Sequence, residues 1–187
     1  MVLVQVLMQR LMISITIILI LSQTSYAQNG IDQIKLSKPN GCNMLFFLQR
    51  DPDTNTVVYE LNFNNDGTIQ KNAPIKASWI RYKEKQKFKE LTALEQKFAY
   101  GILSKLIAED EYEIRLVAYK KMPMYLKKSG TDQKYHLYIK DEGKDLLLKR
   151  VFIRVNRGSF WFPKVQYIDL ITTNSITGME ILKRIKT

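Results

Sequence analysis

Basic and aromatic side chains that stand close together are the strongest candidates for ligand binding in this sequence. From Arg81 to Lys89 every second residue is basic, so an extended chain would place these cations on one side. Such cations attract phosphate or carboxylate groups, and aromatic faces stack on sugars or bases. A solvated, lysine-rich loop is the alternative interpretation of the run. The candidate ligand-binding residues are Trp79, Arg81, Tyr82, Lys83, Lys85, Arg150, Arg154 and Trp161.

Residue types suited to catalysis or metal binding are scarce. The chain has one histidine, His136, and one cysteine, Cys42, and neither lies in a nucleophile motif. The segment 51–55 begins like a calcium loop, but Thr56 occupies the position that requires glycine, so we expect a hairpin turn there. We therefore predict no catalytic residue, no metal ion and no cofactor.

The elements that must position the candidate residues are mostly β-strands. Apolar and polar side chains alternate along residues 57–63, 112–118, 135–139 and 151–155. A period of two residues is typical of half-buried strands. Aspartate, asparagine and glycine pairs between these segments indicate tight turns, as expected for antiparallel pairing.

One segment has a helical period instead. The apolar residues Leu94, Phe98 and Ile102 repeat every four residues, and Thr92 with Glu95 forms a capping-box pattern. We predict a helix over about residues 92–107, and a close approach to the sheet would explain the glycine at position 101. Residues 178–185 fit a strand or a short helix equally. The expected fold is α+β, a mostly antiparallel, strongly curved sheet or partial β-barrel with one main helix.

The first 27 residues have the three parts of a cleavable export signal. One arginine precedes the apolar run 11–21, and a small-x-small exit ends at Ala27, which makes Gln28 the expected mature N-terminus. A membrane anchor would need about 20 apolar residues, roughly twice this run. We expect a periplasmic or secreted protein with no transmembrane segment after signal removal. Translation from Met8 is an alternative to translation from Met1.

The remaining residues are enough for one domain. Removal of residues 1–27 from the 187-residue chain leaves a polar lead-in at 28–43 and a single β-rich domain at 44–187. The formal net charge of +11 becomes +10, because the signal contains one arginine and no acid. This excess favours anionic partners such as an envelope polymer or lipid headgroups. We expect no nucleic-acid partner, because no nucleic-acid fold signature is present and the protein is expected to be exported.

Several sequence blocks resemble those of a known family. The chain contains, in order, NTVVYELNFNNDGTI, APIKASWIRY, LTALEQKFAYGI, EYEIRLVAYKK and GKDLLLKRVFIRV. Together they resemble an exported bacterial family, the domain of unknown function 4833, over nearly all of the mature chain. The resemblance implies a single domain. It implies no catalytic residues, because no activity is assigned to the family.

Three functions from different classes are compatible with these features. The first is a non-catalytic binding or structural module at the cell envelope, with a preference for anionic or glycan-like partners. The second is a carrier of small hydrophobic ligands, with a pocket between the sheet and the helix. The third is a carboxylate-dependent envelope hydrolase, which would need two acids facing each other across a cleft.

Overall fold

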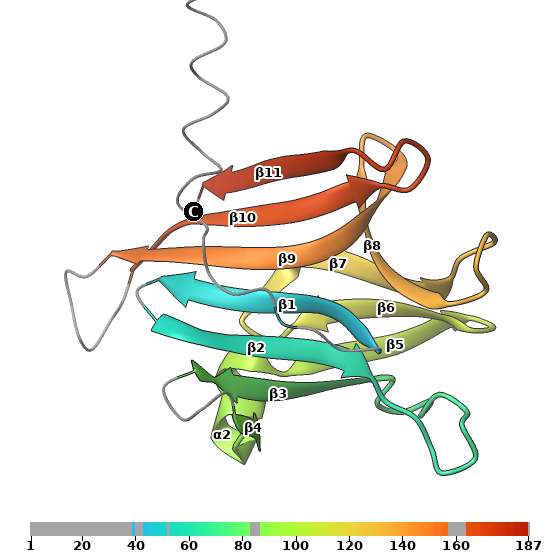
Figure 1. Ribbon diagram of the computed structural model, residues 1–187, viewed down its shortest axis with the longest axis horizontal. Coiled ribbons are helices and arrows are strands. Elements are labelled where there is room, and N and C mark those ends of the chain that lie inside the picture. The colour runs from blue at the N-terminus through green and yellow to red at the C-terminus, as the bar shows by residue number, and fades with distance from the viewer. Residues whose placement is uncertain (1–38, 40–42, 52, 83–86, 157–163, 187) are drawn as a thin grey trace, which may run out of the picture. The chain divides into compact units, whose positions relative to one another are not determined.

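All the described strands belong to one curved sheet, in which the long strand β9 is the branch point (Figure 1). The computed structural model describes residues 39, 43–51, 53–82, 87–156 and 164–186. The first strands are β1 (Met44–Asp51), β2 (Asp53–Leu61), β3 (Ile75–Arg81) and β4 (Lys87–Glu90). The later strands are β5 (Ile102–Ala108), β6 (Glu111–Leu116), β7 (Tyr119–Lys128), β8 (Tyr135–Asp141), β9 (Lys144–Asn156), β10 (Lys164–Asn174) and β11 (Glu180–Lys186).

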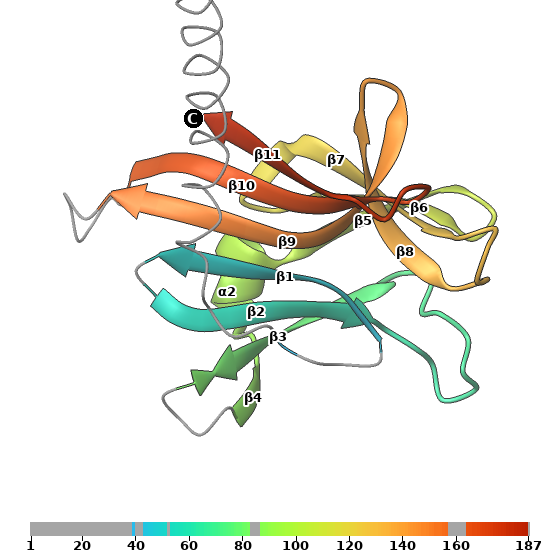
Figure 2. The ribbon, with the colours of Figure 1, turned by 45° about the horizontal axis from the view of Figure 1, so that its top comes forward.

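The branch arises because β9 divides one of its edges between two partners. Residues 146–156 of β9 pair with β10 on one edge. On the other edge, residues 144–147 pair with β8 and residues 150–154 pair in parallel with β1. The strand order is therefore β4-β3-β2-β1-β9-β8-β7-β6-β5, with β10 and β11 continuing from the far edge of β9. The branch that begins with β1 and the branch that begins with β8 separate where they leave β9. Further along, the curvature of the sheet turns them to face each other, which gives an open half-barrel (Figures 1 and 2). The predicted curved, mostly antiparallel sheet with a helix is confirmed.

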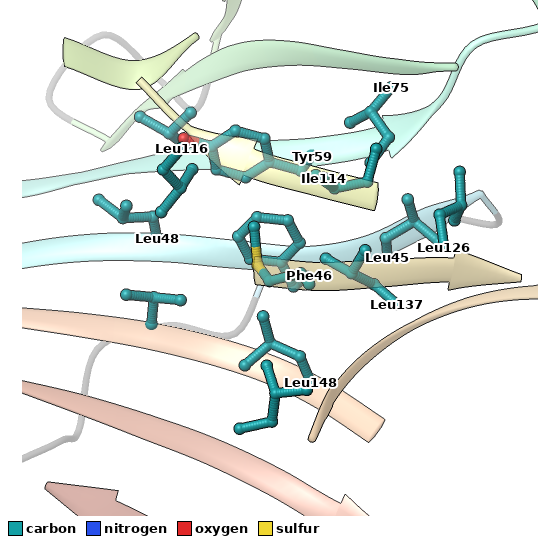
Figure 3. Packing of buried hydrophobic residues seen from close by; sticks show 14 of the residues in the cluster. Leu45, Phe46, Leu48, Tyr59, Ile75, Ile114, Leu116, Leu126, Leu137 and Leu148 are labelled. Carbon is teal, nitrogen blue, oxygen red and sulfur yellow. The ribbon is translucent and has the colours of Figure 1, made fainter. Parts of the chain in front are cut away.

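The hydrophobic core lies on the concave face, between the two branches. Period-two alternation directs Phe46 and Tyr59 inward, where their rings stack in parallel with centroids 4.2 Å apart. Side chains of the opposite branch, including Ile114, Leu126 and Leu137, are fully buried against this cluster. Figure 3 shows the labelled side chains from both branches pointing into the same interior.

The convex face of β1, β2 and β3 also carries buried apolar side chains. Phe47, Val58 and Ile80 form a second buried cluster there, each at most 5% exposed. The nearly continuous apolar sequence of residues 44–49 is therefore explained by burial on both faces of β1.

The helix is shorter than predicted. An α-helical turn, α2 (Ala93–Glu95), continues into a π-helical turn, η2 (Gln96–Tyr100), and the chain then enters β5. The predicted helix over residues 92–107 is wrong beyond Tyr100, because Ile102–Ala108 pairs antiparallel with β6. Apolar residues continue at helical spacing past Gly101, but strand pairing determines the structure there.

Other expectations from the sequence have mixed outcomes. The predicted hairpin is confirmed, because β1 and β2 pair antiparallel, but its turn is tighter than residues 51–55, since β1 ends at Asp51 and β2 begins at Asp53. Residues 178–185, which fitted two structures, lie largely in strand β11. The predicted export signal, including Ala27 and Gln28, lies outside the described residues. Among the residues that are described, no helix is long and apolar enough to span a membrane.

Candidate ligand-binding site

The short helix is fixed at its start by a capping box that also reaches the sheet. The Thr92 Oγ1 atom accepts a hydrogen bond from the Glu95 backbone N–H, and Glu95 Oε2 accepts one from the Thr92 N–H at 2.8 Å. The other carboxylate oxygen of Glu95 accepts a hydrogen bond from Trp79 Nε1 of β3 at 3.2 Å. Burial tends to raise the pKa of Glu95. Hydrogen bonds from Thr92 and Trp79, together with the nearby charge of Arg81, outweigh burial, so the pKa lies below its ordinary value.

The end of the helix is fixed by backbone contacts around Gly101. A β-carbon at Gly101 would lie 1.9 Å from the carbonyl oxygen of Gln96, so the π-helical turn can close only on a glycine. The close approach is thus to the helix itself, and not to the sheet as predicted. The Gly101 carbonyl accepts a hydrogen bond from Val117 N–H at 3.0 Å, and the Tyr100 carbonyl accepts one from the Tyr59 hydroxyl, also at 3.0 Å. These bonds hold the helix against both branches of the sheet.

An apolar pocket lies beside this helix and is lined by the second halves of β1 and β9. Both strands run toward the same end of the half-barrel (Figures 1 and 2). The volume of the pocket is about 410 Å³. Its walls come from β1, η2, the β6–β7 hairpin, β9 and β10. The lining residues are Leu48, Arg50, Phe98, Ala99, Tyr100, Leu116, Ala118, Tyr119, Met122, Val151, Ile153, Val155, Val165 and Ile168.

The pocket has a buried floor and an exposed rim. Leu48, Val151 and Ile168 are 3%, 1% and 6% exposed, whereas Phe98 is 66% exposed. Strand register gives the direction from floor to rim, because Leu48 pairs with Val151 and Arg50 pairs with Ile153 two residues further along both strands. Two residues in a strand span about 6.6 Å. The pocket therefore runs along the inner faces of β1 and β9 from a closed end to an open one.

Arg50 is the single charged side chain among the described residues that line the pocket. It follows Phe46 and Leu48 at period two on the concave face of β1, in a position where the pattern predicts an apolar residue. The side chain is half-buried. The pocket is thus an apolar space with one cation near its opening.

Comparison with known proteins places the chain in a family. The family model described as a domain of unknown function (DUF4833) matches residues 46–184. The chain belongs to this family. Comparison of the DUF4833 chain with curated proteins and with solved structures gives no match. The matched segment includes every lining residue of the pocket, so the pocket lies within the family's domain.

The structure of this DUF4833 domain places Trp79 away from solvent. Its side chain is 7% exposed and belongs to the main core. Besides its hydrogen bond to Glu95, the indole packs edge-to-face on Tyr100, with ring centroids 4.9 Å apart. Trp79 therefore positions the helix that forms one wall of the pocket, and its ring is not exposed for stacking on a ligand.

The neighbours of Trp79 in the candidate set lie on different faces. Arg81 and Tyr82 are both half-buried, but Tyr82 packs on the convex cluster of Phe47, Val58 and Ile80. The predicted residues Lys83, Lys85 and Trp161 lie outside the described residues.

The remaining two candidates share one face of β9, as predicted, and both are engaged. The Arg150 guanidinium lies 5.6 Å from the ring centroids of both Phe47 and Phe152. Burial lowers the pKa of Arg150 to about 10. Arg154 forms an ion pair with Asp51 of the neighbouring strand. The described members of the candidate set are thus divided between the two faces of the sheet and do not form one exposed surface.

The histidine and several acidic residues of the described part of the chain form ion pairs with neighbouring side chains. His136 Nε2 lies 2.8 Å from Asp132, Asp110 pairs with Lys128, and Glu113 pairs with Arg115. Within the described residues, no group of three histidine, cysteine, aspartate or glutamate side chains is arranged to hold a metal ion. The described residues that line the pocket include no carboxylate.

Sequence reasoning missed Arg50 as a site residue, although a signal for it exists. The inward positions of β1 read Phe46, Leu48, Arg50, so a charge interrupts an otherwise apolar face. A charge in such a register indicates either the end of the core or a polar group that faces a cavity.

Proposed function

We propose that this DUF4833 domain is a non-catalytic carrier that binds a small hydrophobic molecule in the apolar pocket. The observation that carries the proposal is an apolar pocket of about 410 Å³ between the sheet and the helix. Ligand pockets typically measure about 300–1,000 Å³ and are lined mainly by apolar side chains with a few polar groups. The size and the lining of this pocket both fit that description.

Packing energetics support the same function. Protein interiors are close-packed. The side chains around an unfilled apolar space lack dispersion contacts on that side, or they stay in contact with water. Phe98, on the helix wall of the pocket, is 66% exposed, so an apolar ligand would cover apolar surface that now faces water. Each Å² of apolar ligand surface moved out of water would contribute about 25 cal/mol.

The carrier function has better structural support than a basic, aromatic binding surface. A stacking surface needs exposed rings beside free cations. Trp79 is in the core, Arg150 lies between two phenylalanine rings, and Arg154 pairs with Asp51. The net charge of +11 still favours an anionic partner, which can be an anionic ligand or an anionic surface.

The proposed place of action is the cell envelope or the extracellular space. The one arginine, the apolar run 11–21 and the small-residue exit at Ala27 support export of the protein. A carrier in that compartment would shield an apolar molecule from water during its passage between surfaces.

The test is binding of a neutral, environment-sensitive dye such as Nile red. Saturable binding at one site per chain is expected, with fluorescence shifted to the blue. Ile153→Trp places an indole in the pocket and should weaken dye binding by at least about tenfold. Ala99→Phe places a phenyl ring in the pocket from the side of the helix and should also weaken dye binding.

The matched control is Ile176→Trp, because Ile176 is 92% exposed in the β10–β11 turn and far from the pocket in register. Circular dichroism would check that all variants are folded. Equal dye binding by the pocket variants and the control, or no saturable binding by the unaltered protein, would contradict the proposed function.

A further inference from the structure

We propose that the ligand of the apolar pocket is a single-chain carboxylate, a fatty acid whose head binds Arg50. This inference rests on the proposed function, because it assigns a chemical class to the ligand of the same pocket. The observations that carry it are the position of Arg50, the absence of an ion pair or hydrogen bond from Arg50 to any described residue, and the volume of the pocket.

Arg50 is placed to meet a ligand. Its partner in the sheet is Ile153, and both residues lie between the buried floor at Leu48 and Val151 and the end of β1 at Asp51. An anionic head beside Arg50 can remain partly hydrated, which avoids the cost of burying a charge in the apolar interior. The chain of the same ligand would then extend along Leu48 and Val151 toward Ile168.

Arg50 differs from the other arginines of the described chain. Arg115 pairs with Glu113, Arg154 pairs with Asp51, and Arg184 makes two hydrogen bonds to Asp169. Arg150 lies between aromatic rings, and the nearby charge of Arg81 helps to lower the pKa of Glu95. Among the described residues, Arg50 makes no such contact. Its guanidinium therefore keeps its donors for a planar carboxylate, which it can bind through two parallel hydrogen bonds.

The volume favours a ligand with one chain. A space of about 410 Å³ lies toward the lower end of the range of about 300–1,000 Å³ found for small-ligand pockets. A single alkyl chain suits a pocket of this size better than the two acyl chains of a membrane lipid. One cation in the lining matches one negative charge, which favours a carboxylate over a phosphate dianion.

The experiment compares dodecanoate with dodecanol, which has the same chain and no charge. Each would displace Nile red from the unaltered protein, from Arg50→Gln and from Arg50→Lys. The unaltered protein should bind dodecanoate about tenfold more tightly than dodecanol, and Arg50→Gln should remove that preference. Arg50→Lys keeps the positive charge but lacks the planar guanidinium group, so this variant should retain part of the preference for dodecanoate. Added salt should weaken binding of dodecanoate but not of dodecanol.

Lys76→Gln is the matched control, because it removes one charge from β3 at a site where the side chain is 58% exposed and outside the pocket. Equal affinities for dodecanoate and dodecanol, unchanged by Arg50→Gln, would overturn the fatty-acid inference and leave the carrier function standing. Displacement by neither ligand, together with no saturable dye binding, would overturn both proposals. A loss of dodecanoate affinity of the same size in Lys76→Gln would show a general charge effect and would also refute the role of Arg50.

Discussion

Replacement of Gly101 by alanine should weaken the contacts that attach the helix to the sheet. The new β-carbon would lie 1.9 Å from the Gln96 carbonyl oxygen and 2.8 Å from its carbonyl carbon. Both atoms belong to the backbone of the same turn, so no side-chain rotation can relieve the overlap. The turn must open, which strains the hydrogen bonds of the Tyr100 and Gly101 carbonyls to Tyr59 and Val117. Two hydrogen bonds at about 1 kcal/mol each, with about 1–2 kcal/mol of overpacking, predict a loss of about 3 kcal/mol in the free energy of unfolding.

Urea unfolding followed by circular dichroism measures this loss, and Gly130→Ala is the matched control. A β-carbon at Gly130 meets no atom within 4 Å, so its replacement should change the free energy of unfolding by less than about 0.5 kcal/mol. Gly101→Ala should also weaken binding of Nile red, because Phe98, Ala99 and Tyr100 form one wall of the pocket. If the two glycine variants unfold at the same urea concentration, the explanation of Gly101 is refuted.

Three other measurements test separate parts of the structure. Asp169→Asn should lower the free energy of unfolding by about 2–3 kcal/mol in urea titrations, because the Asp169 side chain is 1% exposed and accepts two hydrogen bonds from Arg184. The pKa of Glu95 is lower in the folded state than its ordinary value of 4.5, so its stabilising contribution is present above that pH and is lost as pH falls through the folded pKa. Glu95→Gln should flatten this acid dependence of the urea midpoint, and an unchanged slope would contradict the capping-box assignment. Mass spectrometry of exported protein should find Gln28 at the N-terminus, and Ala27→Asp should block its release; retention of residues 1–27 by the unaltered protein would refute the predicted signal.

Local patterns in the sequence were sufficient to predict where the helix begins but not where it ends. The capping box of Thr92 and Glu95 is a contact between near neighbours, so its residue types are enough to predict it. Helical spacing continues through Ile102 and Leu106, and nothing local marks these residues as a strand. Their pairing with Leu116 and Tyr112 of β6 decides the outcome, and that pairing is a tertiary interaction.

The site was harder to predict than the fold, because burial on both faces of the sheet changes what a side chain can do. Alternation correctly places Arg150 and Arg154 on one face of β9. It does not indicate that Phe47 and Phe152 enclose Arg150, or that the indole of Trp79 faces the core. The pocket is still less visible in the sequence, because its lining residues extend from position 48 to position 168 and meet only through the branching of the sheet.

The branching of β9 explains why a pocket exists at this end of the domain. One edge of a strand offers a single row of backbone groups, so β8 and β1 must use different parts of it and separate as they leave β9. Where the branches lie close, Phe46, Leu137 and Leu148 fill the interior (Figure 3). At the far end, the short helix that ends at Gly101 spans the gap without filling it. The same topology that gives the core its shape thus leaves an apolar space at the rim, and Arg50 lies in the last inward position of β1, where that space meets solvent.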